Sequence, residues 1–140
     1  MAHWGFEYVY WPAARQREDA LRLVVMGVDV IVGSSPHVLQ PVVVVSVDGA
    51  GARCSARVTR GGAPGFALVA WSLGNLATIM PTPPCQVGAL LSVTLGRSAI
   101  GARTVDLSEL RRLGGDVGAA LAHARHLLGD DILEDDPWAP

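Results

Sequence analysis

The sequence has little that would mark a nucleic-acid-binding or disulfide-bonded protein. Its 140 residues carry 11 basic and 13 acidic side chains, for a formal charge of −2, and the basic residues form no block. Nucleic acid is therefore not expected as a partner. The two cysteines, Cys54 and Cys85, are widely spaced and form no CxxC pair. Neither a zinc site nor a disulfide framework is indicated.

Long apolar segments are missing as well. Runs such as PVVVVSV (41–47) and ALVAWSL (67–73) are too short to cross a bilayer, so no membrane span is expected in this chain. The opening MAHWGFEYVYWP lacks the basic start and apolar stretch of a signal peptide, and the cellular location stays open. Because this opening resembles the exit of a strand, we expect the chain to be a piece of a longer one or to have a misplaced start codon.

What is present is enough apolar sequence for one domain with a sizeable core, since 50% of the residues are hydrophobic and 17% are charged. The patterns predict a helix over 13–26 and a second helix over 108–129, capped by Ser108 and followed by a frayed acidic tail. Strands are expected at 28–33, 41–47, 52–59, 66–73, 87–95 and 102–107. This order predicts an α/β fold with mixed sheets.

Two of the strands end in polar residues that could form a site. GSSPH (33–37) and SLGN (72–75) would lie close together if their strands share a sheet edge. His37 follows a predicted buried strand and a proline, and it is either a capping or structural histidine or a functional one. His3 is either an incidental N-terminal residue or a ligand. His123 and His126 share a helix face, but no third ligand converges on them, which favours a solvated surface.

The stretch AWSLGN allows a different hypothesis, in which Ser72 is a nucleophile. Its Ala-x-Ser-x-Gly spacing resembles a nucleophile elbow, and Asp116 and His123 follow in the order Ser, Asp, His. A true elbow opens directly into a helix, whereas NLATIMPTPP follows here. The competing interpretation is that Gly74 and Asn75 form a tight turn whose amide points toward a site.

Four motifs in order resemble one family. The chain is similar to the second half of the capsule-synthesis protein CapA family. The similarity lies in HWGFEY (3–8), GVDVIVGSSPHVLQ (27–40) and WSLGN (71–75), together with Pro12, Gln16 and Ala20 between the first two. The family pattern reads approximately HWG-x-EY, then GAD-x-x-x-G-x-HPHV-x-Q and later YSLGN. That family belongs to the calcineurin-like metallophosphoesterase superfamily and is tied to poly-γ-glutamate capsule formation.

The resemblance implies a fold and a boundary. Residues 1–107 would be the C-terminal portion of a metallophosphoesterase-like α/β/β/α sandwich with mixed sheets, and residues 108–140 a C-terminal helix and acidic tail. Family members are often membrane-anchored and extracytoplasmic. The capsule or cell-envelope polymer machinery is the implied partner.

The resemblance also implies a site. His3 and His37 would be ligands of divalent metal ions of the manganese, zinc or iron class. Glu7, Tyr8, Ser35 and Asn75 would be near-site groups, and Asn75 would fix a loop or orient a ligand.

Two departures from the pattern bear on activity. Ser35 stands where the family has the first histidine of His-Pro-His, and a neutral hydroxyl is a poor ligand beside imidazole or carboxylate. The superfamily's early aspartate, histidine and asparagine ligands lie in an N-terminal half that this chain lacks, and that half is a further expected partner. Two imidazoles fall short of a catalytic metal site, so weak metal binding and no activity are expected of this chain alone.

Three functional hypotheses follow. The first is an incomplete CapA-like hydrolase of metallophosphoesterase type, whose catalytic residues are not identified. The second is a non-catalytic binding or scaffold module on the same fold, motivated by Ser35. The third, a serine hydrolase, depends on Ser72.

Overall fold

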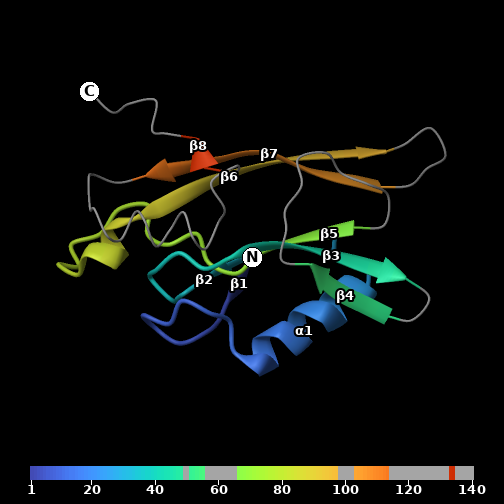
Figure 1. The fold of residues 1–140 in the computed structure, drawn as a ribbon, viewed down its shortest axis with the longest axis horizontal. Helices are drawn as coiled ribbons and strands as arrows, with labels where there is room; N and C mark the ends of the chain where they lie inside the picture. Colours follow the sequence, from blue (N-terminus) through green and yellow to red (C-terminus); the bar gives the residue numbers. More distant parts are fainter. Residues whose placement is uncertain (49–50, 56–65, 98–102, 114–132, 135–140) are drawn as a thin grey trace.

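Three layers stack on one another in the structure, a computed structural model that describes residues 1–48, 51–55, 66–97, 103–113 and 133–134. A helix covers one face of a five-stranded sheet, and a long two-stranded ribbon extended by a short third strand covers the other face (Figure 1). The predicted α/β class with a mixed sheet is confirmed.

The five-stranded sheet is the central layer. Its strands are β1 (Ala2–His3), β2 (Val30–Ser34), β3 (Val42–Asp48), β4 (Gly51–Ser55) and β5 (Phe66–Ala70). Their order across the sheet is β1-β2-β5-β3-β4. The first three in this order are parallel, while β3 runs antiparallel to both β5 and β4. The predicted hairpin of β3 and β4 therefore forms, with Asp48 opposite Gly51.

The central strands are apolar on both faces because both faces are covered. On β3, Val43 and Val45 belong to the core beneath the helix, whereas Val42 belongs to the core beneath the second sheet. On β5, Val69 and Leu68 divide in the same way. Runs with no polar alternation are typical of strands buried between two layers.

Helix α1 (Ala14–Val25) packs on the central sheet through one stripe. Gln16, Ala20 and Val24 are its buried residues, spaced by four so that they lie on one side of the helix. Gln16 also accepts a hydrogen bond from the backbone N–H of Ala13 through Oε1 (2.8 Å), which satisfies a group at the helix start. The helix predicted over 13–26 is confirmed within two residues.

Gly33 lets the N-terminal segment approach the sheet closely. A Cβ at this position would overlap the carbonyl oxygen of Trp71 and the indole nitrogen of Trp4. With no side chain in the way, Trp4 stacks on Trp71 with ring centroids 5.6 Å apart, and its Nε1 donates to the Trp71 carbonyl (3.2 Å). The residues that follow Trp4 are thereby held against the ends of the central strands.

The second sheet is an antiparallel ribbon. A short 3-10 helix, η1 (Pro83–Gln86), leads into β6 (Gly88–Arg97), which pairs with β7 (Arg103–Leu113). A short β8 (Leu133–Glu134) runs parallel to β7 within the acidic segment that was predicted to fray. On β6, Ala89 is buried on the core side and Leu90 is exposed.

The helix predicted from Ser108 is wrong over the residues that the structure describes. β7 continues to Leu113, and β6 offers it a partner over its whole length, so ladder pairing outweighs the helical composition of SELRRL. Ser92 pairs with Glu109 and Val93 with Leu107, which makes Ser108 the extra residue of a bulge rather than a helix cap. Residues 114–129 of that predicted helix lie outside the described residues. The division of the chain at residue 107 stays a prediction, although β7 runs across it.

Candidate functional site

The candidate site lies where neighbouring parallel strands end. His3 is the last residue of β1, Ser34 is the last residue of β2, and β5 leads into Ser72–Asn75. Because β1, β2 and β5 are parallel and adjacent, their carboxyl ends meet at one edge of the sheet. The predicted proximity of GSSPH and SLGN is confirmed by a direct contact between His37 and Asn75.

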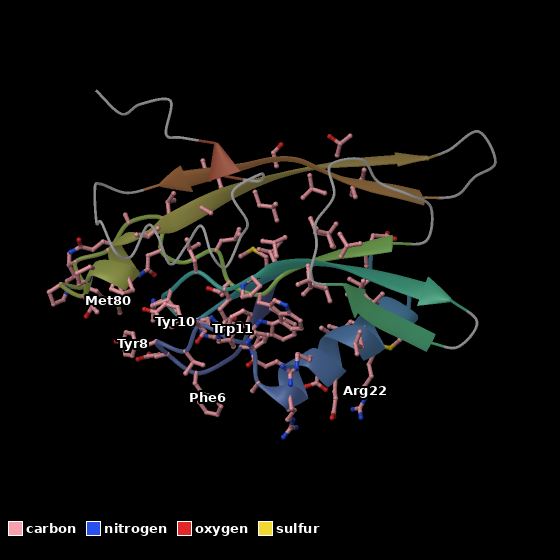
Figure 2. All side chains as sticks on the ribbon, in the orientation of Figure 1. Phe6, Tyr8, Tyr10, Trp11, Arg22 and Met80 are labelled. Carbon is pink, nitrogen blue, oxygen red and sulfur yellow. The ribbon has the colours of Figure 1, made fainter. Side chains whose placement is uncertain are left out.

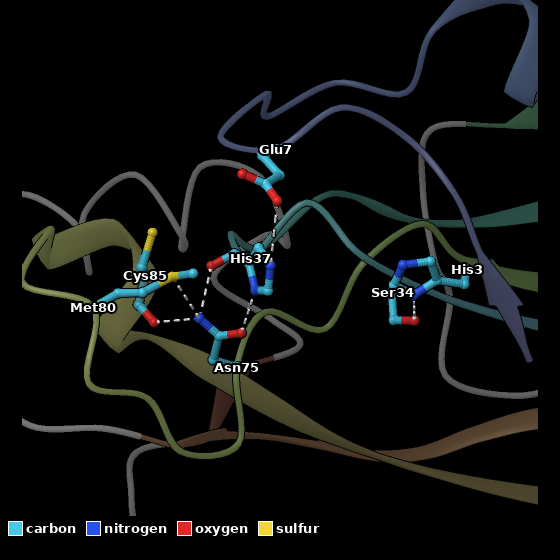
Figure 3. A network of polar contacts seen from close by, with 7 residues as sticks. All are labelled: His3, Glu7, Ser34, His37, Asn75, Met80 and Cys85. Carbon is cyan, nitrogen blue, oxygen red and sulfur yellow. Dashed lines mark hydrogen bonds and ion pairs between the residues drawn. The ribbon is translucent and has the colours of Figure 1, made fainter.

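Asn75 holds the imidazole of His37 in one orientation. Its Nδ2 donates to the carbonyl oxygens of Cys85 (2.9 Å) and His37 (3.3 Å), and also lies 3.9 Å from Sδ of Met80. The amide oxygen is therefore turned to Nδ1 of His37 at 2.9 Å (Figure 3). Because an amide oxygen only accepts, Nδ1 carries the hydrogen. Nε2 of His37 is the ring nitrogen left for chemistry.

Glu7 faces that remaining nitrogen from the other side. Its Oε1 lies 3.9 Å from Nε2 of His37, while the His37 side chain is 33% exposed and that of Glu7 is 58% exposed. Tyr8 stands beside the pair, with its ring centroid 6.5 Å from that of His37. The negative charge of Glu7 raises the pKa of the Tyr8 phenol, and desolvation adds to the rise. The predicted near-site groups Glu7, Tyr8 and Asn75 therefore surround His37.

The backbone is strained at this point. Tyr8 (φ 64°), Ser35 (φ 109°) and His37 (φ 61°) are the non-glycine residues with positive φ in the described ranges. A hydrogen bond from Tyr8 N to the carbonyl of Pro36 (2.8 Å) joins the two strained segments. Such conformations each cost of the order of 1–3 kcal/mol and gather at functional sites, where the surroundings hold them in place.

His3 is set apart from this group. Its Nδ1 lies 3.3 Å from Oγ of Ser34, and Figure 3 shows the two residues away from His37, Glu7 and Asn75. The structure thus gathers one of the two predicted metal ligands with the near-site groups and leaves the other at the end of β1. Ser35 lies half-buried in the turn between them.

The donors that the structure describes around His37 do not by themselves complete the two-metal site that the resemblance implies. Nε2 of His37 and the carboxylate of Glu7 are suitable ligands, and an amide oxygen on Nδ1 is the kind of partner that metal-binding histidines have. A catalytic ion needs three or four protein ligands. No group of three or more His, Cys, Asp or Glu side chains suited to a metal gathers among the described residues.

Several residues that support the site carried no functional signal in the sequence. Gln40 is buried at 1% exposure and donates from Nε2 to the carbonyl of Val9 (2.7 Å), which ties the Glu7 segment to the end of the His37 turn. Cys85 contributes a backbone carbonyl to Asn75, and burial followed by the charge of Glu7 raises the pKa of its thiol. In the sequence, Gln16 and Gln40 could be noticed only as positions of the family motif. The contact of the Cys85 carbonyl could not be predicted, because a backbone group produces no residue pattern.

Ser72 is placed as a structural residue. It is fully buried, and its Oγ accepts a hydrogen bond from the backbone N–H of Gly74 (3.2 Å). A nucleophile elbow needs an exposed hydroxyl and a helix directly after it, and bends and bridges follow Ser72 instead. Asp116, His123 and His126 lie outside the described residues.

Among the described residues, we found no helix with the length and apolar content to cross a membrane.

Comparisons with known proteins point to one family. A family described as "Bacterial capsule synthesis protein PGA_cap" matches residues 1–79, which include every residue of the His37 site except Met80 and Cys85. The PGA biosynthesis protein CapA of Bacillus subtilis (strain 168) is 49% identical over 41 residues, which are 29% of this chain and 11% of that protein. No solved structure matches the chain. With its family match covering more than half of its length, this chain belongs to the bacterial capsule synthesis protein family PGA_cap.

Proposed function

We propose that this chain takes part in the synthesis of a capsule polymer of the poly-γ-glutamate class, as a domain of metallophosphoesterase type whose metal site is degraded. The observation that carries the proposal is the Asn75–His37–Glu7 arrangement at the ends of adjacent parallel strands. A fixed imidazole with one free nitrogen can accept a proton or ligate a metal. The family membership supplies the biological setting.

The roles of the individual residues follow from their contacts. We assign His37 as the group that meets the substrate or a metal through Nε2, because Asn75 occupies Nδ1. His3 is the proposed second ligand, from the neighbouring strand β1. A second ligand at position 35 would restore His-Pro-His, and the serine present there is why we propose a weakened site.

The proposed scaffold is the α/β/β part of a metallophosphoesterase-like sandwich. Helix α1, the mixed sheet and the β6–β7 ribbon are compatible with three of its four layers. The chain's match covers a small share of its curated relative, and we propose that the other ligands and the polymer-handling partners come from the rest of such a protein.

Titration calorimetry with manganese and with zinc tests the weakened site. We expect the unmodified chain to bind either metal weakly and Ser35→His to bind at least about tenfold more tightly, because an imidazole replaces a hydroxyl. Ser35→Gly is the matched control, since it changes the same strained position and adds no ligand. Two tight sites in the unmodified chain would contradict the proposal, as would equal binding by the histidine and glycine variants.

A non-catalytic binding module is the second candidate. It is favoured by the same donor set, in which His37 and Glu7 converge without a third ligand among the described residues. The two candidates separate when the chain is combined with the remainder of a full-length relative. Hydrolysis of a phosphate ester that is lost in His37→Ala supports the enzyme, whereas unchanged polymer binding without hydrolysis supports the module.

A further inference from the structure

The segment between β1 and α1 brings Glu7 to the site, and much of it is exposed. Phe6 is 71% exposed, Tyr8 is 52% exposed and Val9 is 43% exposed. Figure 2 shows Phe6 and Tyr8 pointing away from the body of the molecule. Apolar packing resumes at Tyr10, which lies against the core beneath the second sheet. The position of Glu7 is therefore set chiefly by hydrogen bonds of the segment and not by burial of its neighbours.

Tyr8 is the residue at which this segment turns. Its φ of 64° lies in the left-handed region, which a tyrosine keeps only where the surrounding structure holds it. On the side of Glu7, the backbone N–H of Tyr8 donates to the carbonyl of Pro36 (2.8 Å). If Tyr8 relaxed to a negative φ, the chain before it would rotate relative to the chain after it. The Glu7 carboxylate would then leave its place 3.9 Å from Nε2 of His37.

The hydrogen bond on the other side of Tyr8 comes from a buried amide. Nε2 of Gln40 donates to the carbonyl oxygen of Val9 (2.7 Å). Gln40 is 1% exposed, and its backbone N–H donates to the carbonyl of Ser72 (3.0 Å), in the stretch that leads to Asn75. The amide therefore starts from a fixed point near the site. Because a buried donor without a partner is costly, Nε2 of Gln40 keeps the Val9 carbonyl in place.

We propose that Gln40 is a positioning residue, which holds Tyr8 in its strained conformation and so keeps the Glu7 carboxylate opposite Nε2 of His37. The inference rests on the proposed function for the role of that carboxylate, because the proposed function brings a metal or a proton to the same nitrogen. Its geometric part rests on the two hydrogen bonds that bracket Tyr8. Gln40 thus acts on the site through Glu7.

Proton NMR of the full chain tests the geometry without any ligand. Gln40→Met keeps the length of the side chain and removes the donor. The cross-peaks between the rings of Tyr8 and His37, whose centroids lie 6.5 Å apart, should then disappear. Cross-peaks between Trp4 and Trp71, whose ring centroids lie 5.6 Å apart, should remain and show that the fold is intact.

Two further variants make the NMR experiment specific. Gln40→Asn keeps an amide that is too short to reach the Val9 carbonyl, so it should give the same loss and decides the question if the methionine variant does not fold. Gln16→Met is the matched control, because it makes the same change in a second buried glutamine that bonds to Ala13. It should keep the cross-peaks between Tyr8 and His37.

Zinc affinity, measured by calorimetry, tests whether Gln40 acts through Glu7. In the Ser35→His variant, adding Gln40→Met should lower the affinity for zinc at least about threefold, as expected for coupled residues. The same substitution should have no effect when Glu7→Gln is also present, because the carboxylate that Gln40 positions is then gone. A merely structural role would lower the affinity in both backgrounds.

The outcomes separate the positioning role from the function on which it rests. Cross-peaks between Tyr8 and His37 that persist in both Gln40 variants, or that Gln16→Met removes as fully, would overturn the positioning role and leave the proposed function standing. An equal loss of zinc affinity in both backgrounds would also overturn it. Absence of zinc binding in the histidine variant would count against the proposed function, and the cross-peaks would then decide the positioning role by themselves.

Discussion

The two sheets of this molecule are built from different kinds of strand. β3 and β5 in the central sheet bury both faces, with Val45 at 1% exposure on the helix side and Leu68 at 2% on the side of the second sheet. β6 in the second sheet buries one face, where Ala89 is 7% exposed, and turns Leu90 to solvent at 50%. The first sheet is thus an interior layer and the second an outer layer.

The family relationship follows the same division. The match to the capsule synthesis family covers residues 1–79, which include the whole central sheet and stop before β6. The segment that leads into the second sheet nevertheless reaches the site, because Cys85 in η1 holds Asn75 through its carbonyl. The comparison teaches that segments following the strands of the central sheet carry the site residues, and that η1, which leads into the outer sheet, braces them.

The largest expected effect comes from Gly33 in β2. Gly33→Ala should lower the free energy of unfolding by about 3 kcal/mol or more, because the added Cβ meets the backbone of Trp71, which directly follows β5 and is held by a hydrogen bond to the carbonyl of Pro41. Urea denaturation measures the loss. Gly27→Ala is the control, since Gly27 has positive φ (99°) but open space around it, and should cost about 1 kcal/mol. Similar losses for the two variants would show that close approach at Gly33 is not the constraint.

A pair of core and surface truncations tests the contrast between the sheets directly. Val69→Ala on β5 should cost about 2 kcal/mol, because two fully buried methyl groups are lost and leave a cavity. Leu95→Ala on β6, where the side chain is 64% exposed, should change stability by less than about 0.5 kcal/mol. Equal costs in the same urea experiment would contradict the interior and outer assignment.

Asn75→Ala should cost about 1.5 kcal/mol, because it removes partners from His37 Nδ1 and from the Cys85 carbonyl. The specific readout is the nitrogen NMR of the His37 ring, which should change from hydrogen on Nδ1 to a mixture of tautomers. Asn75→Asp keeps the accepting oxygen and should preserve the Nδ1–H form. An unchanged ring spectrum in the alanine variant would refute the positioning role of Asn75.

The smallest expected effect is a gain. Ser35→Gly should raise the free energy of unfolding by about 1 kcal/mol, because glycine adopts the φ of 109° without strain. Ser34→Gly next to it is the control and should lower stability, since it weakens a strand and removes the hydroxyl beside His3. Thermal unfolding of both variants decides whether the turn at Ser35 stores strain.

The sequence predicts the central layer well because burial on both faces leaves long β-branched runs such as PVVVVSV. The contact between His37 and Asn75 could likewise be predicted from the sequence, since both residues follow strands that end at one edge of the sheet. Helix and strand are harder to separate at Ser108, where SELRRL has helical composition and a partner strand decides the outcome.

Other parts of the site depend on geometry that leaves no residue pattern. Ser35 adopts a glycine-like φ without being glycine, and Cys85 acts through its backbone. His3 matches the motif in spacing, but it is the last residue of β1 and its imidazole lies beside Ser34, so motif spacing alone did not place it with the near-site groups.

The backbone bridge between Gly74 and Gly88 limits how this domain can diversify. A side chain on Gly74 would overlap the carbonyl of Val87, and one on Gly88 would overlap the carbonyl of Asn75. The backbone frame that carries Asn75, formed by Gly74 and Gly88, therefore does not tolerate a side chain at either glycine. Leu76 and Ile79, by contrast, are exposed and can be substituted. A randomised library confined to residues 76–79 would therefore keep the backbone frame that orients His37 intact.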